Sequence, residues 1–343
     1  MPLSLYVDGP CWRDHLTATK VAHPGLVPVV KGNGYGFGVG RLARRAEWLG
    51  VPTIAVGTYR EVREVDRRFS GDIMVLEPWR PFFADVPYSQ RIIHTVGRAS
   101  DLAQLADQAE RPRVVLEALT SMRRHGVGTA ELPELSKDAV TGRAAGVRFE
   151  GHALHLPLGS GHVPEVEQWL SAAPVRRWFI SHLTASELTQ LQDRHPELEF
   201  RSRIGTALWL GDRSFLSPRA TVLDVHSVRR GDRVGYRQRT IGRDGFLLVV
   251  AGGTAHGIAL EAPAAAASPR QRAVSLARGG LDAAGRALSP YVVDGKRRWF
   301  IEPPHMQVSL LFLPAGSTVP DIGTEVVVRV RLTTSHFDRV VVS

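Results

Sequence analysis

The stretch Val29-Val30-Lys31-Gly32-Asn33-Gly34-Tyr35-Gly36-Phe37-Gly38 begins in an apolar run and passes through a lysine into a glycine-rich turn. A short apolar run that ends at glycines is typical of a buried strand. A lysine at the end of such a strand is predicted to point into the mouth at the C-terminal face of a barrel, where barrel enzymes hold their active sites. The stretch matches neither G-x-G-x-x-G nor G-x-x-x-x-G-K-S/T, because its lysine precedes the glycines, so a nucleotide-binding loop is poorly supported.

The run that carries Lys31 is the first of eight short apolar runs in the first two thirds of the chain. Several of these runs are separated by stretches whose apolar residues recur at intervals of three and four, which indicates amphipathic helices. Eight strands that alternate with helices predict a (β/α)8 TIM barrel over residues 9–214. The apolar runs are 26–31, 53–57, 72–76, 91–96, 113–119, 151–157, 177–183 and 200–205, and the helical stretches include 39–49, 58–68, 99–109 and 164–172.

After about residue 214 the pattern changes to strand-like runs that are separated by turn residues. These runs predict a mostly β C-terminal domain over residues 215–343. A first strand within residues 1–8 precedes the barrel and is free to pack on this β domain. Residues 261–286 are rich in alanine, proline and arginine, which predicts a surface insertion. The strand-like runs are 220–225, 246–250, 307–312 and 325–332.

The composition is typical of a globular protein, with 43% of the 343 residues hydrophobic and 22% charged. No apolar run reaches the ~18 residues that a membrane-spanning helix needs, and residues 1–8 lack the basic and apolar regions of a signal peptide. We therefore expect a cytoplasmic protein without a membrane partner. The single cysteine, Cys11, cannot form an internal disulfide and has no second ligand nearby, so we expect no metal site.

The net charge of +9 raises the question of nucleic-acid binding. The basic residues do not form a stripe with interleaved aromatic residues, because the arginines are scattered singly or in pairs. An anionic substrate or cofactor explains this charge equally well, so we expect no nucleic-acid partner. Only four of the 43 basic residues are lysines, namely Lys20, Lys31, Lys137 and Lys296.

The stretch 29–38 resembles the pyridoxal-phosphate lysine motif of the alanine racemase family. Several further motifs occur in the family's order, so that the resemblance extends from about residue 5 to residue 339. Members of that family combine a barrel with a C-terminal β domain and form a dimer. The resemblance therefore implies a pyridoxal 5'-phosphate (PLP)-dependent isomerase, a homodimer with shared active sites that racemises alanine or another small amino acid by two-base transfer of the Cα proton.

The resemblance also implies roles for residues of the barrel. Lys31 corresponds to the Schiff-base lysine and to one of the two bases, and Tyr35 corresponds to a phosphate contact. His155, in Glu150-Gly151-His152-Ala153-Leu154-His155, would lie beside the pyridine ring. In Ser181-His182-Leu183-Thr184-Ala185-Ser186, Thr184 would contact the phosphate.

The segment Arg203-Ile204-Gly205-Thr206 resembles the family segment in which an arginine meets the pyridine nitrogen. The resemblance assigns that role to Arg203 and a phosphate contact to the backbone N–H groups of Gly205 and Thr206. An arginine does not surrender its proton, so it cannot keep the ring nitrogen protonated as a carboxylate would. This property favours rapid return of the proton and argues against a barrel decarboxylase.

Three residues outside these segments correspond to the second base and to the substrate pocket. Tyr236, in Gly231-Asp232-Arg233-Val234-Gly235-Tyr236, corresponds to the base that a partner subunit contributes. Arg124 and Met306 correspond to residues at the substrate carboxylate. From the residues alone, Tyr236 could equally be a cross-strand aromatic after a turn, and Met306 a packing residue.

The chain departs from the family pattern at four positions. Glu117 stands where the family often has a carbamylated lysine, and Leu119 stands at an aspartate position. We expect Glu117 either to pair with Arg124 in place of the carbamate or to cap a strand or face the polar groups of a helix. Thr254 and His336 replace the two tyrosines that narrow the substrate entrance, so the substrate need not be alanine. The alternative is a non-catalytic PLP-binding or regulatory paralogue, but retention of both Lys31 and Tyr236 favours the enzyme.

Overall fold

The computed structural model describes residues 2–87, 89–108, 111–142, 144–260 and 287–343. The chain forms two compact units. One consists of Arg13–Asp212, and the other combines the N-terminal residues up to Trp12 with Arg213–Ser343. Near the N-terminus, the boundary between the two units falls between Trp12 and Arg13, inside helix α1 (Gly9–Ala22). The insertion that the sequence predicts at residues 261–286 lies outside the described residues.

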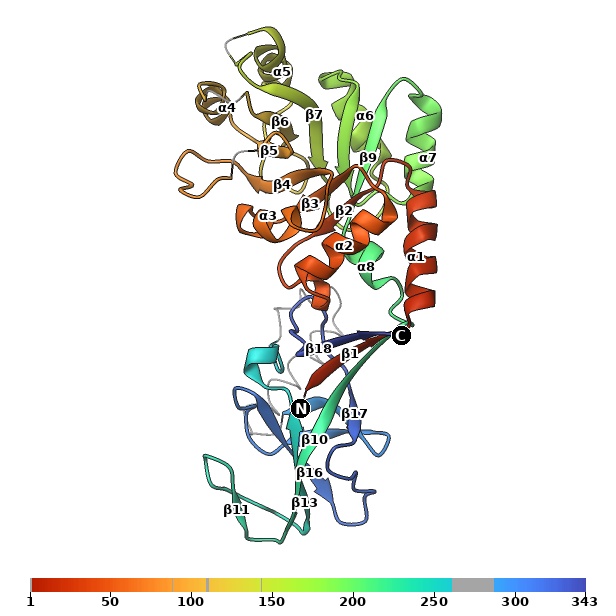
Figure 1. Ribbon diagram of the computed structural model, residues 1–343, viewed down its shortest axis with the longest axis vertical. Coiled ribbons are helices and arrows are strands. Elements are labelled where there is room, and N and C mark those ends of the chain that lie inside the picture. Colours follow the sequence, from red (N-terminus) through yellow and green to blue (C-terminus); the bar gives the residue numbers. More distant parts are fainter. Residues whose placement is uncertain (1, 88, 109–110, 143, 261–286) are drawn as a thin grey trace. The chain divides into compact units, whose positions relative to one another are not determined.

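Eight parallel strands close into a barrel in the first unit, which confirms the predicted (β/α)8 fold (Figure 1). Most of the strands are rich in apolar residues because both of their faces are covered, whereas β7 and β9 also carry several polar and charged side chains. All eight predicted runs correspond to barrel strands, although β7 begins earlier than expected, at Arg148. The barrel strands are β2 (Val27–Val30), β3 (Thr53–Val56), β4 (Asp72–Pro78), β5 (Ile92–Val96), β6 (Arg113–Ala118), β7 (Arg148–His155), β8 (Arg177–Ser181) and β9 (Glu199–Ile204).

Helices cover the outside of the barrel (Figure 1). In α2, the residues Leu42, Ala46 and Leu49 are buried at helical spacing, and Gly50 ends the helix in the left-handed conformation with φ of 64°. Their spacing explains why the periodic stretches of the sequence predict these elements. The helices are α2 (Val39–Leu49), α3 (Tyr59–Asp66), α4 (Ala99–Ala106), α5 (Leu132–Thr141), α6 (Val163–Ala172), α7 (Ala185–Arg194) and α8 (Thr206–Leu210), and a short 3-10 turn, η1 (Gly34–Gly36), follows β2.

The N-terminal end of the barrel is held by a buried ion-pair network around Glu150. Its carboxylate accepts hydrogen bonds from Arg113 at 2.7 Å and from Arg177 at 2.9 Å. Arg148 completes the network at 3.0 Å. In barrels of this type the N-terminal face serves stability and the C-terminal face carries the chemistry. The functional site must therefore be sought at the opposite ends of the strands.

The second unit is mostly β, as the sequence predicts. The long strand β10 (Leu216–Val228) pairs with β17, β13 and β1, so that six strands form a closed circuit. Strand β1 (Leu3–Val7) lies between β10 and β18 (Figure 1). The other strands are β13 (Gly245–Ala251), β14 (Leu288–Val293), β15 (Lys296–Phe300), β16 (Val308–Pro314), β17 (Glu325–Val328) and β18 (Arg339–Val342), with a hairpin of β11 (Arg233–Val234) and β12 (Arg239–Thr240) and a 3-10 turn, η2 (Thr254–His256).

The described residues contain neither a membrane-spanning helix nor a metal-binding cluster. None of the helices there is both long and apolar enough to span a bilayer. That part of the chain also contains no group of three or more histidine, cysteine or carboxylate side chains placed to hold a metal ion.

Candidate active site

Lys31 directly follows β2 and lies at the C-terminal mouth of the barrel, as predicted. Its side chain remains accessible to solvent. The pKa of Lys31 is lowered, mainly because neighbouring atoms restrict its hydration, and further because Arg124 and Arg203 are positively charged. Glu61 acts in the opposite direction. A lowered pKa increases the fraction of neutral amine, which is the form that can react as a nucleophile or accept a proton.

Glu61 of α3 holds the glycine-rich turn next to Lys31. One carboxylate oxygen accepts a hydrogen bond from the N–H of Gly32 at 2.6 Å. The other accepts from the N–H groups of Gly57 and Thr58 at 2.6 and 3.0 Å. The sequence analysis missed this residue, although Thr58 and Glu61 carry the spacing of a capping box. Glu61 therefore joins the ends of β2 and β3 beneath the mouth.

Tyr35 and Gly205 meet across the barrel mouth. Tyr35 is buried and lies in η1 with φ of 54°, a backbone conformation that few non-glycine residues adopt. A Cβ atom at position 205 would lie 2.2 Å from the Tyr35 hydroxyl, so only glycine permits this approach. No side chain caps the first turn of α8, which begins at Thr206. The phenol hydroxyl and these uncapped N–H groups are hydrogen-bond donors suited to an anion.

Arg203 of β9 is buried, with only 4% of its surface exposed. One terminal nitrogen donates a hydrogen bond to the carbonyl oxygen of Leu154 at 2.8 Å. Its Nε–H has no partner among the described residues. Burial lowers the pKa of Arg203 to about 10, and the guanidinium therefore stays charged at neutral pH. A buried donor without a partner fits a bound acceptor such as a ring nitrogen.

His155 lies at the end of β7, and its ring faces a second histidine. Nδ1 of His155 is 3.2 Å from the Ser181 hydroxyl, and its ring packs edge-on against His182 with centroids 5.4 Å apart. Burial and then the charges of Arg203 and Arg124 lower the pKa of His155 to about 3. His155 is therefore a neutral ring at the mouth. The sequence analysis did not single out His182, although it lies inside the quoted segment beside Ser181.

Thr184 has a different local role from the predicted phosphate contact. Its hydroxyl donates to Glu187 at 2.9 Å and accepts from the N–H of Glu187 at 3.2 Å, which caps α7. A phosphate needs a donor, and the only hydroxyl hydrogen is already used. Contact with a phosphate would require the hydroxyl to turn away from Glu187.

Glu117 lies near the end of β6 and is only 2% exposed. One of its carboxylate oxygens has no partner in the described chain. Burial raises the pKa of Glu117 to about 7, against the opposing charges of Arg203, Arg124 and Arg80. The expected ion pair with Arg124 is absent among the described residues, and Arg203 has the largest favourable effect on this carboxylate.

The loop that carries Arg124 folds back on β6. Val127 donates to the carbonyl oxygen of Glu117 at 2.8 Å, and Leu119 donates to that of Val127 at 2.9 Å. Gly126 packs so closely that a Cβ atom there would lie 2.4 Å from the backbone of Ala118. The loop places the accessible side chain of Arg124 at the barrel mouth, where its charge acts on Lys31.

Tyr236 lies in the second unit, on the turn between β11 and β12, and is 84% exposed. Its ring lies over that of His305, with centroids 4.4 Å apart. Met306 is 71% exposed and is next in sequence to His305. The structure therefore brings the predicted second base and the predicted substrate-pocket methionine to one surface of this unit.

The two predicted entrance positions lie close to the same loops. The N–H of Thr254 donates to the carbonyl oxygen of His305 at 2.8 Å. The N–H of His336 donates to the carbonyl oxygen of His256 at 3.2 Å, which is two residues beyond Thr254. Position 254 is a threonine and position 336 a histidine, so neither contributes a tyrosine side chain to the edge of this surface.

Comparison with known proteins gives matches along most of the chain. The family model for the N-terminal domain of alanine racemase matches residues 14–211. An alanine racemase of Campylobacter jejuni subsp. doylei is 26% identical over 233 residues, which are 66% of this chain and 66% of that protein, slightly less than two thirds of its length. An alanine racemase of Mycolicibacterium vanbaalenii is 28% identical over 280 residues, which are 71% of this chain and 70% of that protein.

Solved structures share the architecture at low sequence identity. The alanine racemase of Bartonella henselae with covalently bound pyridoxal phosphate has a TM-score of 0.72 at 16% identity, and the match covers 99% of this chain and 100% of that one. The alanine racemase of the D-cycloserine producer Streptomyces lavendulae has a TM-score of 0.65 at 22% identity, with coverages of 96% and 87%. At such identities the likeness establishes the fold alone.

Proposed function

Because the chain belongs to the alanine racemase family, we propose that it is a PLP-dependent amino-acid racemase. The observation that carries this proposal is the presence of Lys31 and Arg203 together at the barrel mouth, at the ends of the neighbouring strands β2 and β9. Lys31 is an accessible amine with a lowered pKa, and the buried Arg203 retains one N–H without a partner. When bound, PLP accepts the electron pair that remains after the Cα proton leaves, which makes that proton removable.

The residues at the mouth fit this cofactor by their unsatisfied groups. Lys31 would bond to it covalently, and Arg203 Nε would donate to its ring nitrogen. The Tyr35 hydroxyl and the uncapped N–H groups of Gly205 and Thr206 would hold its phosphate. These groups lie at the ends of β2 and β9, which pair side by side in the barrel.

Two further barrel residues would complete the seat. His155 is a neutral ring at the end of β7 and would pack beside the pyridine ring without adding charge. We keep Thr184 as a weaker phosphate contact, because its hydroxyl hydrogen is committed to Glu187. Arg203 remains protonated in this seat, so it directs the chemistry toward returning the proton to Cα.

Inversion at Cα requires one base on each face of the substrate. The Lys31 amine would hold the proton on one face, since its lowered pKa brings it closer to the working pH. The phenol of Tyr236 would serve the other face, and its exposure leaves it free to enter the site of a partner subunit. Arg124 would bind the substrate carboxylate, and Met306 would line the pocket around it. The proposal therefore includes a homodimer with shared sites.

The test is incorporation of solvent deuterium at Cα for a panel of L- and D-amino acids. The wild-type protein with PLP should exchange at least one amino acid from both enantiomers, and Lys31→Ala should exchange none. Borohydride reduction followed by peptide mapping should locate PLP on Lys31. Attachment at Lys31 without any exchange would favour the non-catalytic PLP-binding paralogue. Attachment at another lysine would contradict the site itself.

A further inference from the structure

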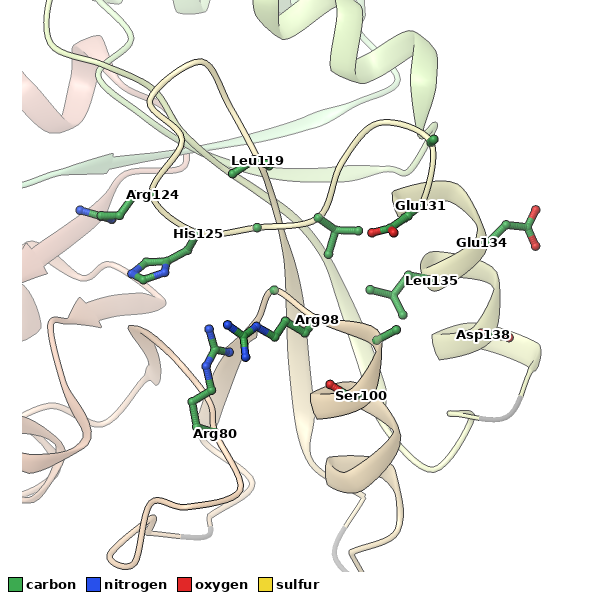
Figure 2. A pocket seen from close by; sticks show the side chains of 15 residues that line it. Arg80, Arg98, Ser100, Leu119, Arg124, His125, Glu131, Glu134, Leu135 and Asp138 are labelled. Carbon is green, nitrogen blue, oxygen red and sulfur yellow. The ribbon is translucent and has the colours of Figure 1, made fainter.

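A cavity of about 790 Å³ opens beside the barrel mouth (Figure 2). It is lined by residues that follow the C-terminal ends of β4, β5 and β6 and by the first turns of α4 and α5. Ligand pockets commonly have volumes of ~300–1,000 Å³. The methyl group of alanine would leave almost all of this space empty. The cavity therefore has room for a much larger side chain than that of alanine.

Three arginines, together with one histidine, gather on one wall of the cavity. Arg80, Arg98, Arg124 and His125 line it from the same side in Figure 2. The pKa of His125 is lowered mainly because its hydration is restricted. The charges of Arg124, Arg80 and Arg98 lower it further, so these three arginines lie within electrostatic range of His125. Clustered arginines in a concave site attract carboxylates and other oxyanions.

Two of the three arginines form no ion pair within the described chain. Arg80 forms an ion pair with the buried Asp101 at 2.7 Å, which fixes its position. The side chains of Arg98 and Arg124 have no hydrogen bond or ion pair with any residue that the structure describes. The opposite wall contributes three carboxylates, those of Glu131, Glu134 and Asp138, and the Glu134 side chain points away from the arginines in Figure 2. The wall formed by the arginines is therefore available to an external anion.

The first turn of α4 adds to the positive field. Arg98 is its N-cap residue, and no side chain caps the helix. Ala99 and Ser100 line the cavity, so the N–H groups of this turn lie at its wall. Unsatisfied N–H groups at a helix start carry partial positive charge. This contribution supplements the arginines and does not stand alone.

Arg124 connects the cavity to the candidate active site. It lines the cavity, and its charge also acts on Lys31 and His155 at the barrel mouth. We infer that the cavity receives a second carboxylate, so that the substrate is an amino acid with an anionic side chain. This inference rests on the proposed racemase function. Arg80 and Arg98 bind the side-chain carboxylate, while Arg124 lies between it and the α-carboxylate.

The test compares amino acids that have almost the same size and differ in charge. Exchange of the Cα proton for deuterium gives kcat/KM of the PLP-loaded enzyme for glutamate and glutamine, for aspartate and asparagine, and for alanine. We expect at least one acidic amino acid to exceed its amide by about tenfold or more, because a charge-assisted hydrogen bond is worth about that factor. Alanine is expected below that acidic substrate.

Variants assign this preference to the cavity. Arg98→Gln should lower the ratio of acid to amide at least about tenfold, and Arg98→Lys should restore part of it. Ser100→Glu, which adds a negative charge at an exposed position of the same wall, should lower the ratio as well. Arg63→Gln removes an exposed arginine of α3 outside the cavity and should leave the ratio unchanged.

Binding gives a readout that does not depend on turnover. Calorimetric titration of the PLP-loaded protein with glutarate should show binding that Arg98→Gln and Ser100→Glu each weaken about tenfold or more. Exchange that favours alanine, with ratios unaffected in both variants, would overturn the inference and leave the racemase proposal intact. Absence of exchange for every amino acid would overturn the racemase proposal and the substrate class with it.

Discussion

The phenol ring of Tyr236 lies over the imidazole of His305, with ring centroids 4.4 Å apart and planes inclined by 37°. Both residues are held by the buried Glu302. Its carboxylate accepts from the N–H of Tyr236 at 3.1 Å and from His305 Nε2 at 2.6 Å. A Cβ atom at Gly235 would lie 2.3 Å from this carboxylate, so the turn closes around it. An exposed phenol is thus oriented from beneath by a buried negative charge.

Glu302→Gln should impair catalysis by loosening this turn. The other carboxylate oxygen of Glu302 accepts from the N–H of Arg237 at 3.2 Å. Glutamine keeps the size but offers one acceptor oxygen where the carboxylate offers two, so at least one N–H loses its partner. We expect Cα exchange to fall about tenfold for the enantiomer whose proton Tyr236 removes, with unchanged PLP absorbance. Glu47→Gln is the matched control, since Glu47 similarly accepts from the N–H and hydroxyl of Ser70 on the barrel unit. Equal rates in both variants would contradict the positioning role.

Tyr236→Phe should retain the cofactor and lose proton removal on one face. The phenyl ring preserves the packing on His305, whereas the group that accepts the proton is gone. In single-turnover experiments, one enantiomer should lose its α-proton at least a hundredfold more slowly, and the other should change little. Equal losses for both enantiomers would contradict the assignment of Lys31 and Tyr236 to opposite faces.

Mixed subunits test whether the sites are shared. Lys31→Ala and Tyr236→Phe should each be nearly inactive alone. If a tyrosine completes the site of its neighbour, a mixed dimer contains one site with both bases intact, so mixing should recover measurable exchange. Subunit exchange is checked by mass spectrometry of intact dimers. Mixed dimers without recovered activity would place Tyr236 in the site of its own chain or outside any site.

Glu117 predicts a specific dependence of stability on pH. Its pKa is raised to about 7 in the folded protein by burial, against about 4.3 in an unfolded chain. Between these values the folded protein holds a proton that the unfolded chain has released, so the free energy of unfolding falls as pH rises. Over this window the wild type should lose about 3 kcal/mol relative to Glu117→Gln. Urea unfolding at several pH values measures the difference, and Glu134→Gln on the surface of α5 is the control.

The role of Tyr35 as a phosphate contact and the role of Thr184 as a helix cap can be distinguished by their effects on cofactor binding and on stability. Tyr35→Phe should weaken PLP binding to the apoprotein about tenfold, because the free phenol hydroxyl is a phosphate donor. Thr184→Val should lower the free energy of unfolding by about 1 kcal/mol through loss of the α7 cap. It should change PLP affinity much less. Fluorescence titration and urea unfolding of both apoproteins measure these effects. A larger loss of PLP affinity in Thr184→Val than in Tyr35→Phe would indicate that Thr184 contacts the phosphate.

The barrel can be predicted from the sequence because its determinants are local. Most of the parallel strands are short and mainly apolar runs, and α2 shows its buried face at helical spacing. The position of Lys31 at the mouth follows from the polarity of a parallel strand, since the residue after β2 must lie at the C-terminal face. These features require no knowledge of distant contacts.

The contacts across the mouth cannot be predicted in the same way, because they join residues that are far apart in the chain. The approach of Tyr35 to Gly205 depends on closure of β2 against β9. The raised pKa of Glu117 was not expected, because the burial of a carboxylate and its distances from the arginines that oppose this effect are properties of the folded barrel. The engagement of Thr184 by Glu187 is an exception, since the capping-box spacing is visible in the sequence.

The position of β1 has a consequence for the order of folding during synthesis. Both of its partners, β10 and β18, follow the whole barrel in the sequence. A nascent chain therefore carries β1 unpaired while the ribosome translates the barrel, which can fold as soon as β9 emerges. The sheet of the second unit is completed only when β18 arrives. The unit that carries Tyr236 is then the last to mature, so newly made protein would acquire the proposed cofactor site of the barrel before it acquires the proposed second base.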